Sequence, residues 1–132
     1  MMKKYIGLLT EESENYIIDF GLGDWSAVKT KAPVEVTTTG YFLSYARIMS
    51  SVAALLGKEG DAASFAQLTD NIRNAYNAKF FHEAEGTYAD GSQTALACAL
   101  FHGFPPPERR AQIAANLVKK IQENDGLLDT GQ

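Results

Sequence analysis

A glycine-rich stretch near the N-terminus, Gly21-Leu22-Gly23-Asp24-Trp25, combines the residue types that a sugar site needs. A carboxylate such as Asp24 can accept hydrogen bonds from paired hydroxyl groups, and the flat apolar face of Trp25 can stack on the C–H face of a sugar ring. The same short pattern is also compatible with a surface loop whose tryptophan, the only one in the chain, covers the core. The loop alone therefore leaves a ligand site and a structural turn both open.

Two further polar residues stand where helices are expected to begin. Glu35 precedes the run Thr37-Thr38-Thr39, and a carboxylate in the first turn also favours the positive end of the helix dipole. Gln93 opens an apolar helix, where its amide either faces a site or caps the helix. The acidic residues of the preceding loop are interpreted as solvated charges: Glu83, Glu85 and Asp90.

Other kinds of chemistry find little support, and we predict neither a metal site nor a cofactor. The two histidines, His82 and His102, lie far apart, and no HxxxH or CxxC spacing occurs. Both are interpreted as solvent-facing or capping residues. Cys98 lies in an alanine- and leucine-rich run, as expected for a small buried residue. GLGD is neither a dinucleotide fingerprint nor a P-loop.

Length and composition point to one globular domain. The chain has 132 residues, a formal net charge of −4 and a hydrophobic fraction of 45%. The acidic balance argues against nucleic acid and anionic membrane surfaces as partners, because both require a concentrated basic surface. The apolar runs are too short to cross a bilayer. No signal peptide is recognised, and the compartment stays open between cytoplasm and periplasm.

Helical periodicity dominates the chain. Residues 2–12 are expected to form a short helix, and residues 14–20 an extended segment. Gly57 is a C-terminal cap for the first long helix, Asp61 an N-cap for the second and Ser92 an N-cap for the third. Gly103 and three prolines end that third helix, and the segment 82–92 reads as a turn-rich loop.

Three apolar stripes at spacings of three and four residues define the expected buried faces. The third helix, 93–102, is instead apolar on nearly every side, which is typical of a helix buried all round. The stripes are Phe42, Tyr45, Ala46, Met49, Ala53 and Leu56; then Phe65, Leu68, Ile72, Ala75, Tyr76 and Phe80; then Ile113, Ala114, Leu117, Val118 and Ile121.

A weak internal repeat sets the fold class. The helix–glycine–helix arrangement around Gly57 recurs around Gly103, as in α-solenoids and α/α toroids. We predict an all-α fold of consecutive antiparallel helical hairpins, as found in α-solenoids and α/α toroids. Such an open array leaves apolar ends uncovered, so the chain is expected to be a piece of a larger protein or to form a homo-oligomer.

The order of the segments resembles a known family. GLGDW, a Pro-Val-Glu-Val-Thr connection, the LGK…DA…F…L…I…AYN..FF stretch, GTYADGSQTALACAL and LLDTG follow one another as in the catalytic barrel of bacterial α-L-rhamnosidases, glycoside hydrolase family seventy-eight. The similarity runs from about Tyr16 to Gly131. It implies that the helical hairpins form part of an (α/α)6 toroid and that residues 1–132 are one fragment of a catalytic α/α barrel domain, incomplete at both ends. Gln132 departs from the apolar residue that usually follows TG.

The resemblance implies hydrolysis of terminal α-L-rhamnosyl residues with inversion, which requires one carboxyl group as general acid and another as general base. In the family both catalytic carboxyl groups lie on stretches that do not occur in these 132 residues. No catalytic residue is therefore assigned, and the chain alone is expected to be inactive. The resemblance places Asp24 and Trp25 at the sugar subsite, with Glu35 and Gln93 as weaker candidates at the barrel mouth.

Two alternatives stay open. Related (α/α)6 glycosidases and lyases share the helical parts, so a different sugar substrate is compatible with the same pattern. A small helical-repeat scaffold that binds a protein partner would explain the repeat and the apolar third helix. It would not explain a glycine loop with Asp24 and Trp25 ahead of the repeats.

Overall fold

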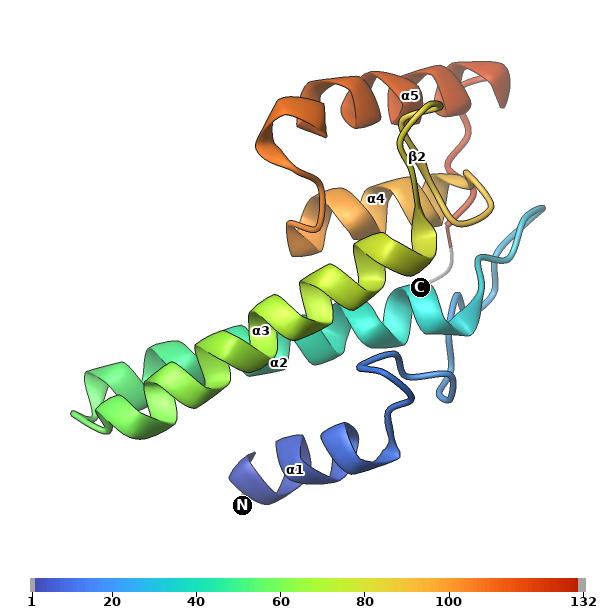
Figure 1. Ribbon diagram of the computed structural model, residues 1–132. Coiled ribbons are helices and arrows are strands. Elements are labelled where there is room, and N and C mark those ends of the chain that lie inside the picture. The colour runs from blue at the N-terminus through green and yellow to red at the C-terminus, as the bar shows by residue number, and fades with distance from the viewer. Residues whose placement is uncertain (1, 131–132) are drawn as a thin grey trace.

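A computed structural model describes residues 2–130 of the chain, which form five α-helices, a 3-10 helix and a small antiparallel hairpin. Figure 1 shows two long helices side by side, with shorter helices on either side of them. The elements are α1 (Met2–Glu12), α2 (Val34–Leu55), α3 (Glu59–Phe80), β1 (Phe81–His82), β2 (Thr87–Tyr88), α4 (Gln93–His102), η1 (Pro107–Arg109) and α5 (Arg110–Glu123). The predicted all-α fold is confirmed.

Helices α2 and α3 form the longer of two helical hairpins. They meet at Gly57, whose φ of 66° is a left-handed conformation that glycine adopts without strain. The N–H of Lys58 bonds to the carbonyl of Ala53, closing the end of α2. The expected cap at Gly57 is therefore confirmed. Asp61 is not an N-cap, because α3 begins at Glu59 and Asp61 lies in its first turn, where it pairs with Lys3 at 2.7 Å.

The second hairpin joins α4 to α5 through Gly103 and the proline run. The Ser92 hydroxyl accepts from the N–H of Ala95 at 3.2 Å, which confirms its role as N-cap of α4. Gly103 ends the helix at a φ of 78°, as Gly57 ends α2. The segment 82–92, expected to be a loop, includes the β1–β2 hairpin, in which Phe81 pairs with Tyr88. Its two-residue strands are too short to give a periodic signal.

Helix α2 is central, since it contacts α1, α3 and α4, while α5 packs on α4. The core between them confirms most of the predicted stripe positions. Tyr45, Leu56 and Val118 are exceptions, because each is at least 38% exposed. The side chains that fill the centre without measurable exposure include Val36, Phe42, Leu43, Ala46, Ile72, Tyr76, Tyr88, Leu96, Ala99 and Ile113.

The segment between α1 and the glycine loop turns back on itself instead of forming the expected extended stretch. Glu14 and Ile17 make an isolated antiparallel bridge, and Asn15 and Tyr16 take positive φ values. Ile18 is then fixed to α2, because its N–H donates to the Thr39 hydroxyl at 3.0 Å. This contact places the glycine loop at the N-terminal end of α2.

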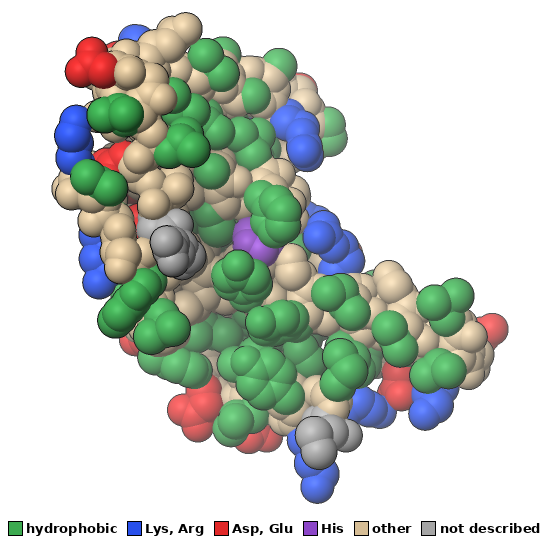
Figure 2. Space-filling model, turned by 180° about the vertical axis from the view of Figure 1, so that it is seen from behind, with side chains coloured by type: hydrophobic (Ala, Val, Ile, Leu, Met, Phe, Trp, Pro, Cys, Tyr) green, Lys and Arg blue, Asp and Glu red, His purple; other side chains and the backbone are tan. Residues whose placement is uncertain are grey.

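One face of the molecule stays apolar. Figure 2 views the chain from behind and shows hydrophobic side chains gathered over much of that face. A run of ring contacts joins Tyr5 on α1 to Tyr45 and Tyr41 on α2, and Tyr41 to His102 on α4. Phe101, 77% exposed, lies beside His102 and shows that α4 is not buried all round. Within residues 2–130 no helix has the length and apolar character needed to cross a bilayer.

Candidate functional site

The glycine loop rests directly on the first turns of α2, and its two glycines allow that close approach. Gly21 has a φ of 129°, and a Cβ there would lie 2.7 Å from the Thr38 methyl group. Gly23 has a φ of 66°, and a Cβ there would lie 3.0 Å from Val34. Any larger residue would lift the loop off the helix, so the loop needs both glycines for its shape and position.

Asp24 and Trp25 point in different directions. Asp24 is 3% exposed, and its Oδ2 accepts from the backbone N–H of Ala32 at 3.2 Å. That bond closes the loop that runs from Asp24 to Ala32. Trp25 is 56% exposed, so its ring face is available to a ligand. The pair thus divides into an inward carboxylate that shapes the loop and an outward aromatic surface.

A second carboxylate holds the same loop from the other side. Both oxygens of Asp129 are used: Oδ1 accepts from the N–H of Lys29 at 2.6 Å, and Oδ2 accepts from the N–H and the hydroxyl of Thr30 at 3.0 and 2.5 Å. The Thr30 hydroxyl and the Lys29 amide hold the pKa of the Asp129 carboxyl below its usual range. The loop is therefore anchored to a residue about a hundred positions away.

Gln93 connects this anchor to α4. Its Oε1 accepts from the N–H of Asp129 at 3.0 Å, and its Nε2 donates to the carbonyl of Leu127 at 3.1 Å. Gln93 is 5% exposed, and both the oxygen and the nitrogen of its amide bond to the segment that follows α5. The structure thus links Gln93 to the tryptophan loop through Asp129.

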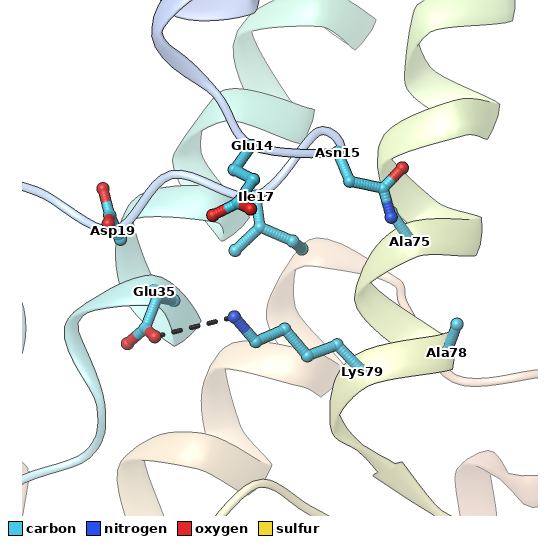
Figure 3. A pocket seen from close by; sticks show the side chains of 8 residues that line it. All are labelled: Glu14, Asn15, Ile17, Asp19, Glu35, Ala75, Ala78 and Lys79. Carbon is cyan, nitrogen blue, oxygen red and sulfur yellow. Dashed lines mark ion pairs between the residues drawn. The ribbon is translucent and has the colours of Figure 1, made fainter.

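Glu35 opens into a separate hollow of about 560 Å³ between α2, α3 and the segment after α1. Figure 3 shows the Lys79 side chain reaching across this hollow toward Glu35, and their charged atoms lie 3.7 Å apart. The lining also carries Glu14, Asn15 and Asp19. Because Asp24, Trp25 and Gln93 do not line it, the four predicted residues are not gathered around one cavity.

A second hollow, of about 450 Å³, lies against the glycines of the loop and is lined mainly by aromatic side chains. Tyr5, Tyr41 and Tyr45 line it together with Phe20 and Gly21–Gly23. It is continuous with the apolar face described above. Its chemistry favours apolar or ring-shaped groups over charged ones.

The buried titratable side chains between α2 and α4 serve packing. His102 was expected to face solvent or to cap a helix, and this prediction is wrong. The side chain is 3% exposed, and its Nδ1 lies 2.7 Å from the Ser44 hydroxyl. Burial, with a smaller effect of Arg47, lowers the pKa of His102 to about 4. Burial raises the pKa of the Cys98 thiol to about 12, which is the opposite of what a nucleophile requires.

Close helix packing explains that burial. A Cβ on Gly40 would lie 2.5 Å from the His102 ring and 3.0 Å from the Cys98 sulfur. Glycine at this position lets α2 approach α4 directly. Within residues 2–130 no group of three or more His, Cys, Asp or Glu side chains is arranged to hold a metal ion.

Asp129 and Thr30 are the polar residues that the sequence did not single out. Neither lies in a periodic segment, and they are separated by 99 positions. The only available signal was the LLDTG string in the family resemblance, which names the residue without indicating its partners.

Comparison with known proteins places these features in a family. The model of the bacterial α-L-rhamnosidase six-hairpin glycosidase domain matches residues 1–132. An α-L-rhamnosidase of Formosa agariphila is 24% identical over 99% of the chain. The chain covers 15% of that protein.

Solved structures agree. A Streptomyces avermitilis α-L-rhamnosidase complexed with L-rhamnose superposes with a TM-score of 0.91 at 29% identity, over 98% of this chain and 12% of that one. The α-L-rhamnosidase of Dictyoglumus thermophilum gives 0.89 at 33% identity, over 98% and 16%. The Aspergillus terreus enzyme, at 21% identity and a TM-score of 0.80 over 98% and 17%, supports the fold alone.

The chain thus spans 12% to 17% of the length of these relatives. Its two helical hairpins and its match to the six-hairpin domain agree with the expected part of an α/α toroid. The chain belongs to the bacterial α-L-rhamnosidase six-hairpin glycosidase domain family.

Proposed function

We propose that residues 1–132 form one part of the catalytic barrel of a glycoside hydrolase that removes terminal α-L-rhamnosyl residues from rhamnosides. The observation that carries this proposal is the superposition on the Streptomyces avermitilis enzyme, at a TM-score of 0.91 over 98% of the chain. That structure is described as a complex with L-rhamnose. The exposed Trp25 ring, on a loop anchored by Asp24 and Asp129, is compatible with such a ligand.

In this proposal Trp25 supplies a stacking face for the sugar ring, and Asp24 contributes to hydroxyl recognition. Because Asp24 is 3% exposed and accepts from Ala32, a sugar hydroxyl reaches its carboxylate only when the loop shifts. Glu35 is a weaker candidate, because Lys79 neutralises part of its charge. Gln93 holds the segment that anchors the tryptophan loop, because its side-chain amide is hydrogen-bonded to the backbone of Asp129 and Leu127.

Cleavage with inversion needs two carboxyl groups roughly 6.5–9.5 Å apart, one protonating the leaving oxygen and one activating water. The family resemblance places both on stretches that these 132 residues do not include. The chain spans at most 17% of its relatives, which supports the same view. We therefore propose that the chain by itself binds part of the sugar and does not turn it over.

Turnover is tested by incubating the purified chain with 4-nitrophenyl α-L-rhamnoside. We expect no release of nitrophenol above a buffer blank. Release that is abolished in Asp24→Asn and retained in Asp70→Asn, an exposed α3 position, would overturn the proposed inactivity.

Sugar binding is tested through Trp25, whose emission reports on the loop without interference from another tryptophan. Titration with methyl α-L-rhamnoside should change the emission saturably, and methyl α-D-glucoside should change it much less. Calorimetry on Trp25→Ala should show weaker binding than on the unmodified chain. Equal responses to both sugars would favour a different (α/α)6 glycosidase or lyase.

The apolar face favours a second function, association with another protein surface. The aromatic run from Tyr5 to His102 and the 77% exposed Phe101 present an apolar area that stable monomers seldom leave uncovered. We propose that the isolated chain forms a homo-oligomer through this face. Light scattering should give a mass above 14.4 kDa that Tyr45→Glu lowers, whereas a monomer at high concentration contradicts it.

A further inference from the structure

We infer that Asp129 is a positioning residue: it holds the tryptophan loop against the N-terminal end of α4 and so sets where Trp25 stands. The functional consequence rests on the proposed sugar site, whereas the positioning itself does not. The inference starts from three hydrogen bonds that converge on one carboxylate from two consecutive loop residues, Lys29 and Thr30.

The loop has few other means of staying in place. Most residues from Phe20 to Lys31 are exposed, including Leu22, Trp25 and Val28 at 73%, 56% and 76%. Apolar burial therefore contributes little to its position. Asp24 closes the loop locally at Ala32, and Asp129 anchors the far side of that closed loop four residues beyond Trp25.

Asp129 is itself fixed in space. Its backbone N–H donates to the Gln93 side chain, and Gln93 lies in the first turn of α4 directly after the Ser92 cap. Asn124 and the neighbouring Leu127 add a further bond within the segment after α5. The anchor thus passes from the rigid end of α4 through Gln93 and Asp129 to the loop.

The charged groups around Asp129 do not disfavour its ionised form relative to its protonated form. A hollow of about 260 Å³ beside it is lined by Lys29, Asp90, Lys120 and Glu123. The Lys29 ammonium also bonds to the Asn124 side chain. Two cations and two carboxylates largely balance, so the hydrogen bonds from Thr30 and Lys29 dominate. Protonation would remove charge-assisted bonds, which are about twice as strong as neutral ones.

The first experiment is amide hydrogen exchange on the full chain, with Asp129→Asn compared with Asp70→Asn. The protection factors of the Lys29 and Thr30 amides should fall on the order of tenfold in Asp129→Asn and stay unchanged in the control. Acrylamide quenching of Trp25 should rise in parallel, while the unfolding midpoint barely moves. Unchanged protection of both amides in Asp129→Asn would overturn the inference.

Thr30 provides an independent variant that leaves Asp129 in place. Thr30→Val removes the hydroxyl bond to Oδ2 and keeps the side-chain shape, so Trp25 quenching should increase. Thr30→Ser keeps the hydroxyl and should restore the quenching of the unmodified chain. Failure of Thr30→Ser to differ from Thr30→Val would contradict an anchor that works through this bond.

The pH dependence sharpens the assignment. Because the folded-state pKa of Asp129 lies below its usual value, the anchor should be complete above about pH 4 and should weaken as pH falls through the lowered pKa. Protection factors at Lys29 and Thr30 should follow this profile. The profile should be absent in Asp129→Asn.

The consequence for the sugar is measured separately. Methyl α-L-rhamnoside should bind several-fold more weakly to Asp129→Asn than to Asp70→Asn. Sugar binding without any change in loop protection would reject the positioning role and leave the proposed function intact. A change in loop protection in a chain that binds no rhamnoside would reject the proposed function and keep the positioning role.

Discussion

The interior between α2, α3 and α4 and the loop from Phe20 to Ala32 are held by different forces. In the interior, side chains such as Phe42, Tyr76 and Leu96 have no measurable exposure, and their rings and methyl groups contact one another directly. In the loop, two carboxylates accept backbone N–H groups and little apolar surface is covered. Stability therefore resides in the helices, and the position of the candidate site depends on a few polar bonds.

The difference implies that the two regions respond differently to mutation. Emptying part of the interior should lower the free energy of unfolding by several kcal/mol, because a cavity adds to the lost burial. Removing a polar anchor of the loop should leave global unfolding almost unchanged, because the loop can open without the helices separating. The following predictions test that separation.

The largest effect is expected at Phe104, just after α4. Its ring is 1% exposed and stacks on Tyr76, with centroids 3.6 Å apart. Phe104→Ala should lower the free energy of unfolding by about 3–5 kcal/mol, measured by urea denaturation with circular dichroism. Phe101→Ala is the matched control, since that ring is 77% exposed and should contribute less than about 0.5 kcal/mol to the monomer. Similar losses for both variants would show that α4 is not packed as described.

A smaller effect is expected on acidification, through His102. Its folded-state pKa of about 4 lies below the unfolded value, because burial and Arg47 disfavour the charged ring. The unfolded chain therefore binds the proton first, and stability should fall as pH drops from about 6.5 to about 4. The difference between the two pKa values corresponds to a loss on the order of 3 kcal/mol over this range.

His82 provides the control for that prediction. It is exposed, its ring bonds to the carbonyl of Ala89, and it is the other histidine of the chain. His82→Gln should keep the decline between pH 6.5 and 4 unchanged. If the decline disappears in His82→Gln, the buried histidine is not its source.

The sequence predicted the helical interior better than the loop. Helical stripes report burial directly, so α3 and most of α2 were predicted, as were the caps at Gly57 and Ser92. Leu56 was misplaced because periodicity assigns a residue to a stripe without showing where the stripe ends. Tyr45 lies within the stripe, but its ring turns toward the partly exposed rings of Tyr5 and Tyr41. His102 was expected to face solvent or to cap a helix, whereas Gly40 leaves room for its ring to be buried between α2 and α4.

The loop was predicted in part. The residue types in GLGDW were compatible with a sugar site, which stays a prediction, and nothing local showed that Asp24 turns inward to Ala32. The anchor at Asp129 could not be predicted from spacing, because Thr30 and Asp129 are 99 positions apart and four α-helices lie between them in the sequence, from α2 to α5. Long-range polar contacts of single residues leave no period in a sequence, whereas helix packing does.

A smaller stability change is expected at the N-cap of α4. Ser92→Ala removes the acceptor for the Ala95 N–H and should cost about 1 kcal/mol in urea denaturation. Ser64→Ala is the control, since that hydroxyl bonds to the Gly60 carbonyl on the exposed side of α3. A loss in Ser92→Ala no greater than in Ser64→Ala would mean that the cap does not stabilise α4.

Replacing Trp25 should give the smallest change in stability and the largest change in sugar binding. Trp25→Ala removes a side chain that is 56% exposed, so the free energy of unfolding should shift by less than about 0.5 kcal/mol. Trp25→Ala should nevertheless weaken the binding of methyl α-L-rhamnoside measured by calorimetry, because it removes the apolar face on which the sugar ring is proposed to stack. A large loss of stability would show that Trp25 covers the core, which is the structural alternative to a sugar-binding loop. Only stability retained together with binding lost would assign the Trp25 ring to the ligand, because the anchors at Asp24 and Asp129 remain in place in this variant.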